Sequence, residues 1–95
     1  MKPYTVFGSF TAHEGKVDEL INILTSGHDM NCFPGCREYR LFKDSENQDK
    51  LWIFEAWDNP EAHKESLNDE IIKTQIEKAM PLIESFGENI TLVEV

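Results

Sequence analysis

The chain has 95 residues and a mass of 11.0 kDa, which is enough for one domain, so residues 1–95 are treated as a single domain. Its 18 acidic and 9 basic residues give a formal net charge of −9. A surface this negative argues against binding to nucleic acid or to an anionic membrane. No apolar run is long enough to span a bilayer and no signal peptide is visible, so we expect a cytoplasmic protein.

The first third of the chain predicts a strand, a helix and a turn. Residues 4–12 are rich in β-branched and aromatic side chains, which is typical of a strand. Apolar residues then recur at helical spacing over residues 17–24, and Gly27 is a natural end for this helix. Pro34-Gly35 predicts a type II turn.

Two strands and a polar connector are predicted next. Side chains alternate over residues 37–43, and the polar residues 44–49 have the length of a hairpin connection. Residues 50–57 are almost continuously apolar and aromatic, which predicts a central strand. Alternation places Trp52, Phe54 and Ala56 on one face of this strand and Leu51, Ile53, Glu55 and Trp57 on the other.

The last part of the chain predicts two helices and a final strand. Asn59 is an expected N-cap with Pro60 at the first helical position, and Asn68-Asp69 is typical of a second cap. Pro81 must end or kink the second helix, and residues 90–95 alternate as a strand. The apolar residues expected on one face of the second helix are Ile72, Ile76, Ala79, Met80 and Ile83.

The order β-α-β-β-α-β in one small chain predicts an α+β fold, a ferredoxin-like antiparallel sheet with helices on one face. This arrangement leaves the second face of the sheet bare, although the central strand is apolar on both faces. The simplest cover is a second copy related by a two-fold axis, so we expect a homodimer.

The sequence lacks the common motifs for cofactors. Cys32 and Cys36 enclose three residues, a spacing that favours two reduced thiols beside a turn over a redox pair or half of a metal site. No glycine-rich phosphate loop is present, and no two histidines have metal-ligand spacing on one helix. We therefore expect no metal or other cofactor, and acid–base or substrate-driven chemistry in an apolar, aromatic pocket.

Glu55 is the first candidate catalytic residue. It shares a strand face with apolar neighbours, and loss of water around a carboxyl raises its pKa toward the range useful for acid–base catalysis. The alternative is a structural ion pair with Arg37 or Arg40 on the neighbouring strand, with Trp57 as an ordinary core residue.

Two histidines are further candidates. His63 falls in the first turns of the helix after Pro60, where it either lines a pocket at the end of the strand or is half exposed. His28 follows a helix C-terminus, an end that favours an imidazolium, so either a capping role or an acid–base role is open. His13 lies in a turn and is expected to be solvated.

The chain resembles the antibiotic biosynthesis monooxygenase (ABM) domain family. The resemblance covers nearly the whole chain, and it is carried by Pro34-Gly35-Cys36 leading into Tyr39, by Trp52-Ile53-Phe54-Glu55-Ala56-Trp57 and by Pro60-Glu61-Ala62-His63. It implies a dimeric α+β barrel of the quinol monooxygenase type, with Glu55, Trp57 and His63 near the pocket. A branch that processes autoinducer-2-phosphate has a histidine after the first helix and a Glu-Ala-aromatic triplet, which His28 and Glu55-Ala56-Trp57 match.

The function expected from the sequence is a cofactor-independent monooxygenase that acts on a quinol or polyphenolic small molecule. Glu55, His63 and His28 are the candidate catalytic residues, and the expected substrate contacts are Trp57, Phe54, Trp52 and Tyr39. The alternatives are an isomerase or degradation enzyme for a small signalling carbohydrate phosphate, and a non-catalytic binding domain. A sugar phosphate would require a cation such as Arg37, Arg40 or Lys43 in the pocket, whereas a quinol pocket should be nearly uncharged.

Overall fold

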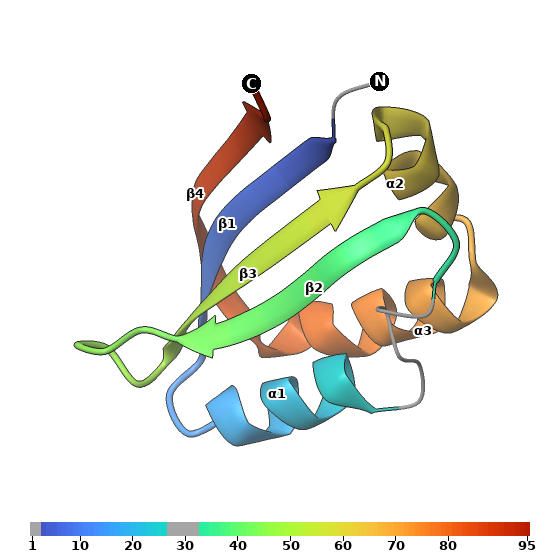
Figure 1. Cartoon of the computed structure of the whole chain (residues 1–95). Helices are drawn as coiled ribbons and strands as arrows, with labels where there is room; N and C mark the ends of the chain where they lie inside the picture. Colours follow the sequence, from blue (N-terminus) through green and yellow to red (C-terminus); the bar gives the residue numbers. More distant parts are fainter. Residues whose placement is uncertain (1–2, 27–32) are drawn as a thin grey trace.

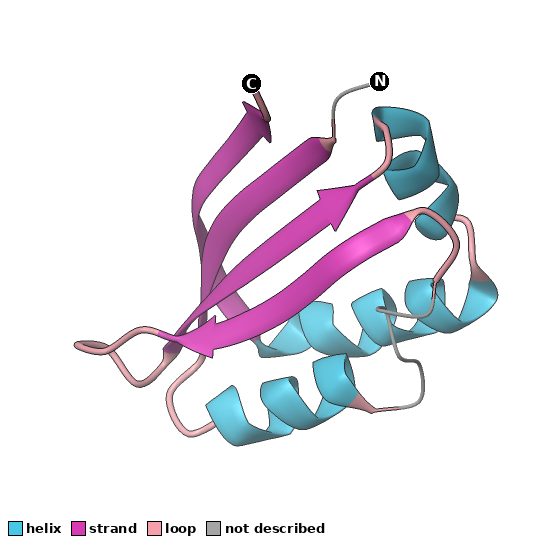
Figure 2. Cartoon of the chain, viewed as in Figure 1, coloured by secondary structure: helices cyan, strands magenta, loops and turns pink. Residues whose placement is uncertain are grey.

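The computed structural model describes residues 3–26 and 33–95, and it consists of one antiparallel sheet with helices on one face (Figures 1 and 2). The strand order is β2-β3-β1-β4, so the predicted central strand is indeed internal. The α+β, ferredoxin-like fold predicted from the sequence is confirmed. The elements are β1 (Tyr4–Ala12), α1 (Val17–Thr25), β2 (Cys36–Lys43), β3 (Lys50–Trp57), α2 (Pro60–Ser66), α3 (Glu70–Ala79), a short 3-10 helix (Met80–Leu82) and β4 (Ile83–Val93).

The helices after β3 begin where the capping residues predict. The Asn59 side chain accepts a hydrogen bond from the backbone N–H of Ala62 at 2.8 Å, and Pro60 is the first residue of α2. Asp69 caps α3 by accepting from the N–H of Ile71 at 3.3 Å. α1 ends at Thr25, and the predicted stop at Gly27 lies outside the described residues.

The predicted apolar face of α3 is only partly buried. Ile72 and Ala79 are buried, but the side chains of Ile76 and Met80 are 40% and 49% exposed. The helix ends at Ala79 because Pro81 cannot continue it, and Ile83 already belongs to β4. The prediction of a single face that includes Met80 and Ile83 was therefore wrong at its C-terminal end.

The last strand is longer than predicted. It begins at Ile83, whereas the sequence pattern indicated a strand only from Ile90, and it ends at Val93. β4 pairs with β1 alone and forms an edge of the sheet, where polar residues on a strand can remain in water. The polar stretch of residues 84–89 therefore joins the sheet without an alternating apolar pattern.

The side of the sheet that packs against the helices contains two clusters of buried residues. The larger one lies between the sheet and α1 and consists of Phe10, Ala12, Val17, Leu20, Leu51 and Ala79. The smaller one is built on Trp57 and Ile72, and Tyr4, Phe33, Cys36, Tyr39 and Ala62 pack against it. This second cluster lies where β3 runs into α2, and Trp57 at its centre contacts Glu55 and His63.

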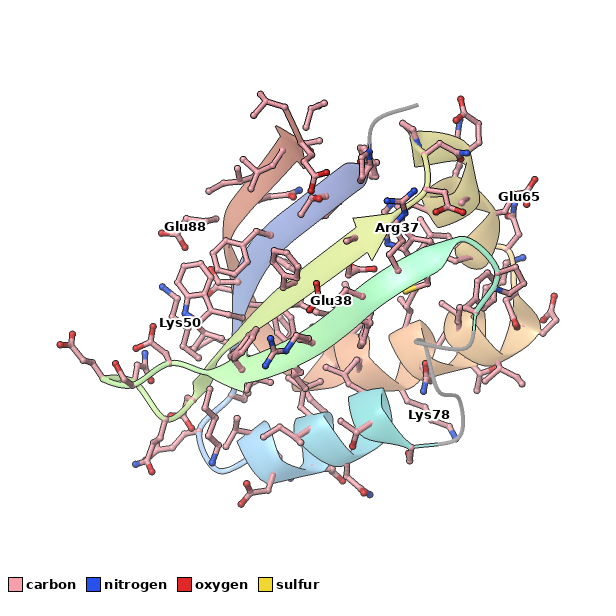
Figure 3. All side chains as sticks on the ribbon, viewed as in Figure 1. Arg37, Glu38, Lys50, Glu65, Lys78 and Glu88 are labelled. Atoms are coloured by element: carbon pink, nitrogen blue, oxygen red, sulfur yellow. The ribbon has the colours of Figure 1, made fainter. Side chains whose placement is uncertain are left out.

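In the part of the chain that the structure describes, no helix covers the opposite face of the sheet (Figure 1). Phe7 stacks on Trp52 with ring centroids 5.0 Å apart and contacts Phe54 edge-on at 6.2 Å. Strand pairing extends this apolar face, hereafter the open face, to Phe42 on β2 and Ile90 on β4. At its border the Lys50 ammonium lies 3.6 Å from the Glu88 carboxylate (Figure 3).

Among the described residues, no helix combines the length and the apolar character needed to cross a membrane.

Candidate active site

Glu55 lies in the middle of the sheet on the side that packs against the helices. Its cross-strand neighbours are Val6 on β1 and Tyr39 on β2, and its side chain is only 14% exposed. Burial raises the pKa of the Glu55 carboxyl, and this effect exceeds the opposing effects of nearby His63 and of a hydrogen bond from Trp57. The pKa of the Glu55 carboxyl is therefore closer to neutral pH than that of an exposed glutamate.

His63 meets this carboxyl from α2. The N-cap at Asn59 starts the helix directly after β3, which directs the first turn of α2 back over the end of the strand. The Nε2 atom of His63 lies 3.8 Å from Oε1 of Glu55, a distance for an ion pair when the imidazole is protonated. The sequence left two roles open for His63, and with an exposed side-chain fraction of 22% it is largely buried.

Two aromatic rings fix the orientation of the imidazole. The ring of Tyr4 lies 5.7 Å from the His63 ring, and the ring of Trp57 lies 5.4 Å from it. Tyr4 and Trp57 are direct partners in the β1–β3 register, so the sheet itself sets the spacing of the two rings. Tyr4 was not among the predicted site residues, because the pairing of β1 with β3 is what brings it to the site.

Trp57 lies behind His63 and is fully buried, with 0% of its surface exposed. Its indole Nε1–H donates a hydrogen bond of 3.2 Å to Oε1 of Glu55, the same oxygen that faces His63. The ring of Phe33 contacts it edge-on at 6.0 Å. In this conformation the indole packs beneath the site and offers no surface to a ligand.

A pocket of about 330 Å³ opens beside these groups, and it is lined by Tyr4, Pro60, Glu61, His63 and Lys64. His63 is the residue that belongs both to the pocket and to the buried group around Glu55. A ligand in this pocket could contact the imidazole, whereas Glu55 contacts His63 and is not part of the pocket lining. The arrangement can accept a proton from a ligand and stabilise the resulting imidazolium.

Tyr39 borders the same buried group from β2. Burial raises the pKa of the Tyr39 phenol well above its ordinary value, and the nearby Glu55 and Cys36 side chains add to this rise. The phenol therefore keeps its proton at neutral pH. Tyr39 packs against the Trp57 cluster and is not part of the pocket wall.

The turn at Gly35 positions α2 over the site. Gly35 has a φ of 83°, in the left-handed region that favours glycine, as the predicted turn requires. Its carbonyl accepts a hydrogen bond from the N–H of Asp58 at 2.8 Å, and a Cβ at this position would lie 2.6 Å from the Cβ of Ala62. Sequence reasoning identified the turn but not its contact with the helix that carries His63.

The structure does not bring all predicted site residues together. Trp52 and Phe54 lie on the open face, across the sheet from Glu55 and His63. His28 and Cys32 fall outside the described residues. Within one chain, Trp52 and Phe54 therefore cannot line the pocket beside His63.

The cations proposed as anchors for a sugar phosphate have other partners. Arg37, which is labelled in Figure 3, pairs with Asp58 at 2.6 Å. Arg40 lies 3.8 Å from Glu38, and Lys43 lies 3.7 Å from Asp18 on α1. The alternative interpretation of the sequence paired Glu55 with Arg37 or Arg40. In the structure, Glu55 contacts His63 and Trp57 instead.

Two further features concern metal binding and a second hollow. Within residues 3–26 and 33–95, no group of three or more His, Cys, Asp or Glu side chains is arranged to hold a metal ion. A hollow of about 500 Å³ lies between α1 and α3, and it contains none of the predicted site residues. The chemistry-bearing side chains are gathered at the smaller pocket instead.

Comparison with known protein families assigns the chain to a family. The family model described as Antibiotic biosynthesis monooxygenase matches residues 3–78, and the chain therefore belongs to this family. A comparison with curated proteins found no match.

Solved structures agree with this family. A protein from Chloroflexus aurantiacus J-10-fl, named for the antibiotic biosynthesis monooxygenases, is 36% identical with a TM-score of 0.90, over 98% of this chain and 93% of that one. A protein from Shewanella oneidensis is 27% identical with a TM-score of 0.85, over 99% of this chain and 94% of that one. A Nitrosomonas europaea protein, at 9% identity and a TM-score of 0.82 over 97% and 88% of the two chains, shares the fold.

Proposed function

We propose that this protein is a cofactor-independent monooxygenase that acts on a quinol or polyphenolic aromatic. The observation that carries the proposal is the partly buried pair of Glu55 and His63, with Oε1 and Nε2 3.8 Å apart, in which His63 lines a pocket of about 330 Å³. Family membership supports the reaction class, and the site supports the role of each residue.

In this proposal His63 is the general base and Glu55 is the carboxylate that pairs with it. His63 lines the pocket and can take a proton from a phenolic hydroxyl of the substrate, whereas Glu55 contacts His63 and is not part of the pocket lining. The carboxylate then stabilises the imidazolium, which is the division of labour in other carboxylate–imidazole pairs. Tyr4 and Pro60 provide the apolar wall against which an aromatic ring would lie.

The substrate itself supplies the two electrons that reduce the second oxygen atom of O₂ to water. Deprotonation gives an electron-rich phenolate, which passes one electron to O₂; the two radicals then combine to form a carbon–oxygen bond. The peroxide oxygen takes back the proton held by His63, and loss of water from this hydroperoxide, with the single hydrogen of the reacting ring carbon, leaves a carbonyl group. One oxygen atom enters the product and the other leaves as water, so no external reductant is consumed.

Charge at the pocket favours the phenolic substrate over a sugar phosphate. Arg37, Arg40 and Lys43 are engaged by carboxylates elsewhere, and the one cation of the pocket wall, Lys64, is accompanied by Glu61. The opposite charges of Lys64 and Glu61 largely cancel, so the pocket offers little net attraction for a dianionic phosphate. A neutral or singly ionised aromatic has no such requirement.

The proposal is tested by recording O₂ uptake with a set of hydroquinones and naphthohydroquinones, and with a pentose phosphate as the alternative substrate. We expect turnover of an aromatic member, and His63→Ala should lower kcat by about 100-fold or more, the usual contribution of a general base. His13→Ala is the matched control, because His13 is an exposed turn residue far from the pocket wall. Binding of aromatics without O₂ uptake by the wild-type protein would indicate a binding domain instead.

We also propose that the working unit is a homodimer formed through the open face. Phe7, Trp52, Phe54, Phe42 and Ile90 make this face apolar, and β4 carries further exposed apolar side chains such as Leu92. An apolar face meets its own copy across a two-fold axis without a separate complementary surface. The pocket beside His63 lies on the other side of the sheet and remains accessible in such a dimer.

A further inference from the structure

The buried indole of Trp57 has no role of its own in the proposed reaction, but it is hydrogen-bonded to a residue that does, Glu55. Full burial of a tryptophan requires an acceptor for its N–H, and Oε1 of Glu55 provides it at 3.2 Å. In return, the carboxylate receives a donor in a place from which most water is excluded. The two side chains are two residues apart on β3, so they point to the same side of the sheet.

We propose that Trp57 is a positioning residue, which holds the carboxylate of Glu55 beside His63 and keeps that carboxylate ionised. This inference rests on the proposed function, because it assigns a role within the same site. Both Nε1 of Trp57 and Nε2 of His63 face Oε1 of Glu55, and the two rings also contact each other at 5.4 Å. One indole therefore fixes the carboxylate through its N–H and the imidazole through its ring.

The charged and titratable groups around Glu55 come from three elements. His63 faces it from α2, and its charge lowers the pKa of the Glu55 carboxyl. Tyr39 and the Cys36 thiol face the site from β2, and Glu55 contributes to the raised pKa of Tyr39. Tyr4 reaches it from β1 through its contact with His63. Among these neighbours, Trp57 supplies the hydrogen bond that favours the ionised carboxylate.

Removal of the indole N–H should therefore leave Glu55 more easily protonated. In Trp57→Phe the ring contacts are largely kept, but the carboxylate loses its donor and burial acts with less opposition. The pKa of Glu55, already raised by burial, should rise further. At a given pH near that pKa, fewer molecules then carry the charge that stabilises a protonated His63.

The chain contains a matched control. Trp52 also donates its indole N–H to a carboxylate, Oδ2 of Asp44 at 2.8 Å, but it does so on the open face. This bond is the first cause of the lowered pKa of Asp44. Trp52→Phe should raise the pKa of Asp44 and leave that of Glu55 where it was.

The test is a pH titration followed by NMR of the side-chain carboxyl carbons, which needs no substrate and is therefore independent of whether quinol turnover is found. The expected result is a Glu55 midpoint at higher pH in Trp57→Phe, and a Glu55 midpoint equal to wild type in Trp52→Phe. An unchanged Glu55 midpoint in folded Trp57→Phe would overturn the proposal.

A second measurement uses the wild-type protein and covers the case in which Trp57→Phe does not fold. The indole N–H resonance of Trp57 should move with the same midpoint as the Glu55 carboxyl carbon, whereas that of Trp52 should not. If the Trp57 resonance is insensitive to the ionisation of Glu55, the hydrogen bond does not report on that carboxylate and the positioning role fails. If it does follow Glu55, the role stands even where no monooxygenase activity is detected.

Discussion

The contact between Gly35 and Ala62 allows a quantitative test of how α2 is held over the site. In Gly35→Ala, the new Cβ would lie 2.6 Å from the Cβ of Ala62, closer than two non-bonded carbon atoms can approach. The residue would also have to keep a φ of 83°. The substitution therefore combines a backbone cost with a steric cost.

Gly15 separates the two costs. It has a φ of 80°, nearly that of Gly35, but a Cβ there would meet nothing within 4 Å. A left-handed backbone costs a residue with a Cβ about 1–2 kcal/mol, and overpacking typically costs about 1–3 kcal/mol more. We expect Gly15→Ala to lose about 1–2 kcal/mol of unfolding free energy and Gly35→Ala about 2–5 kcal/mol. The effect of alanine on the unfolded chain is common to both and cancels in the comparison.

Urea denaturation of the wild type and the two variants measures these differences. Adding Ala62→Gly to Gly35→Ala should recover part of the loss, because it removes the atom that the new Cβ would meet. Equal losses in Gly15→Ala and Gly35→Ala, or no recovery in the double variant, would refute the steric reasoning. Because His63 follows Ala62 directly in α2, folded Gly35→Ala should also lose activity beyond its unfolded fraction.

Two further predictions concern Glu55 and the open face. Burial raises the folded-state pKa of Glu55 above its ordinary value of 4.5, so the folded protein binds this proton more tightly than the unfolded chain. The stability of the wild type should therefore fall relative to that of Glu55→Gln as the pH rises from about 4.5 through the raised pKa of Glu55. Urea midpoints of both proteins, measured as a function of pH, test this. Parallel curves for the wild type and the variant would contradict the prediction. For the open face, sedimentation should give about twice the chain mass of 11.0 kDa at micromolar concentration, whereas a monomer would remove the proposed dimer.

Local signals in the sequence were sufficient for most of the fold. Alternation and aromatic content located β1, β2 and β3, and the capping side chains of Asn59 and Asp69 located the starts of α2 and α3. These signals succeed because the physical cause of each element lies within its own residues. β4 was predicted too short because much of it is held by pairing with β1 at the sheet edge, and no alternation of its own residues 84–89 records that pairing.

The site was predictable only as far as it depends on one strand and one helix. Period two placed Glu55 and Trp57 on the same face, and the N-cap placed His63 near the end of β3. The sequence could not show that the ring of Tyr4 contacts His63, because that contact depends on the register of β1 against β3. It also could not distinguish Trp57 as a pocket wall from Trp57 as a buried donor.

In the proposed mechanism, burial of Trp57 strengthens the interaction between Glu55 and His63. A fully exposed pair at 3.8 Å would be screened by water and would contribute little, whereas here the indole occupies the space in which solvent would stand. The same burial would drive the carboxyl toward its neutral form if the indole offered no hydrogen bond. A phenylalanine at this position could exclude the water but has no N–H for the carboxylate, and a small polar residue could donate a hydrogen bond but would leave room for water. Tryptophan does both, because its buried ring excludes water and its Nε1–H donates to Glu55.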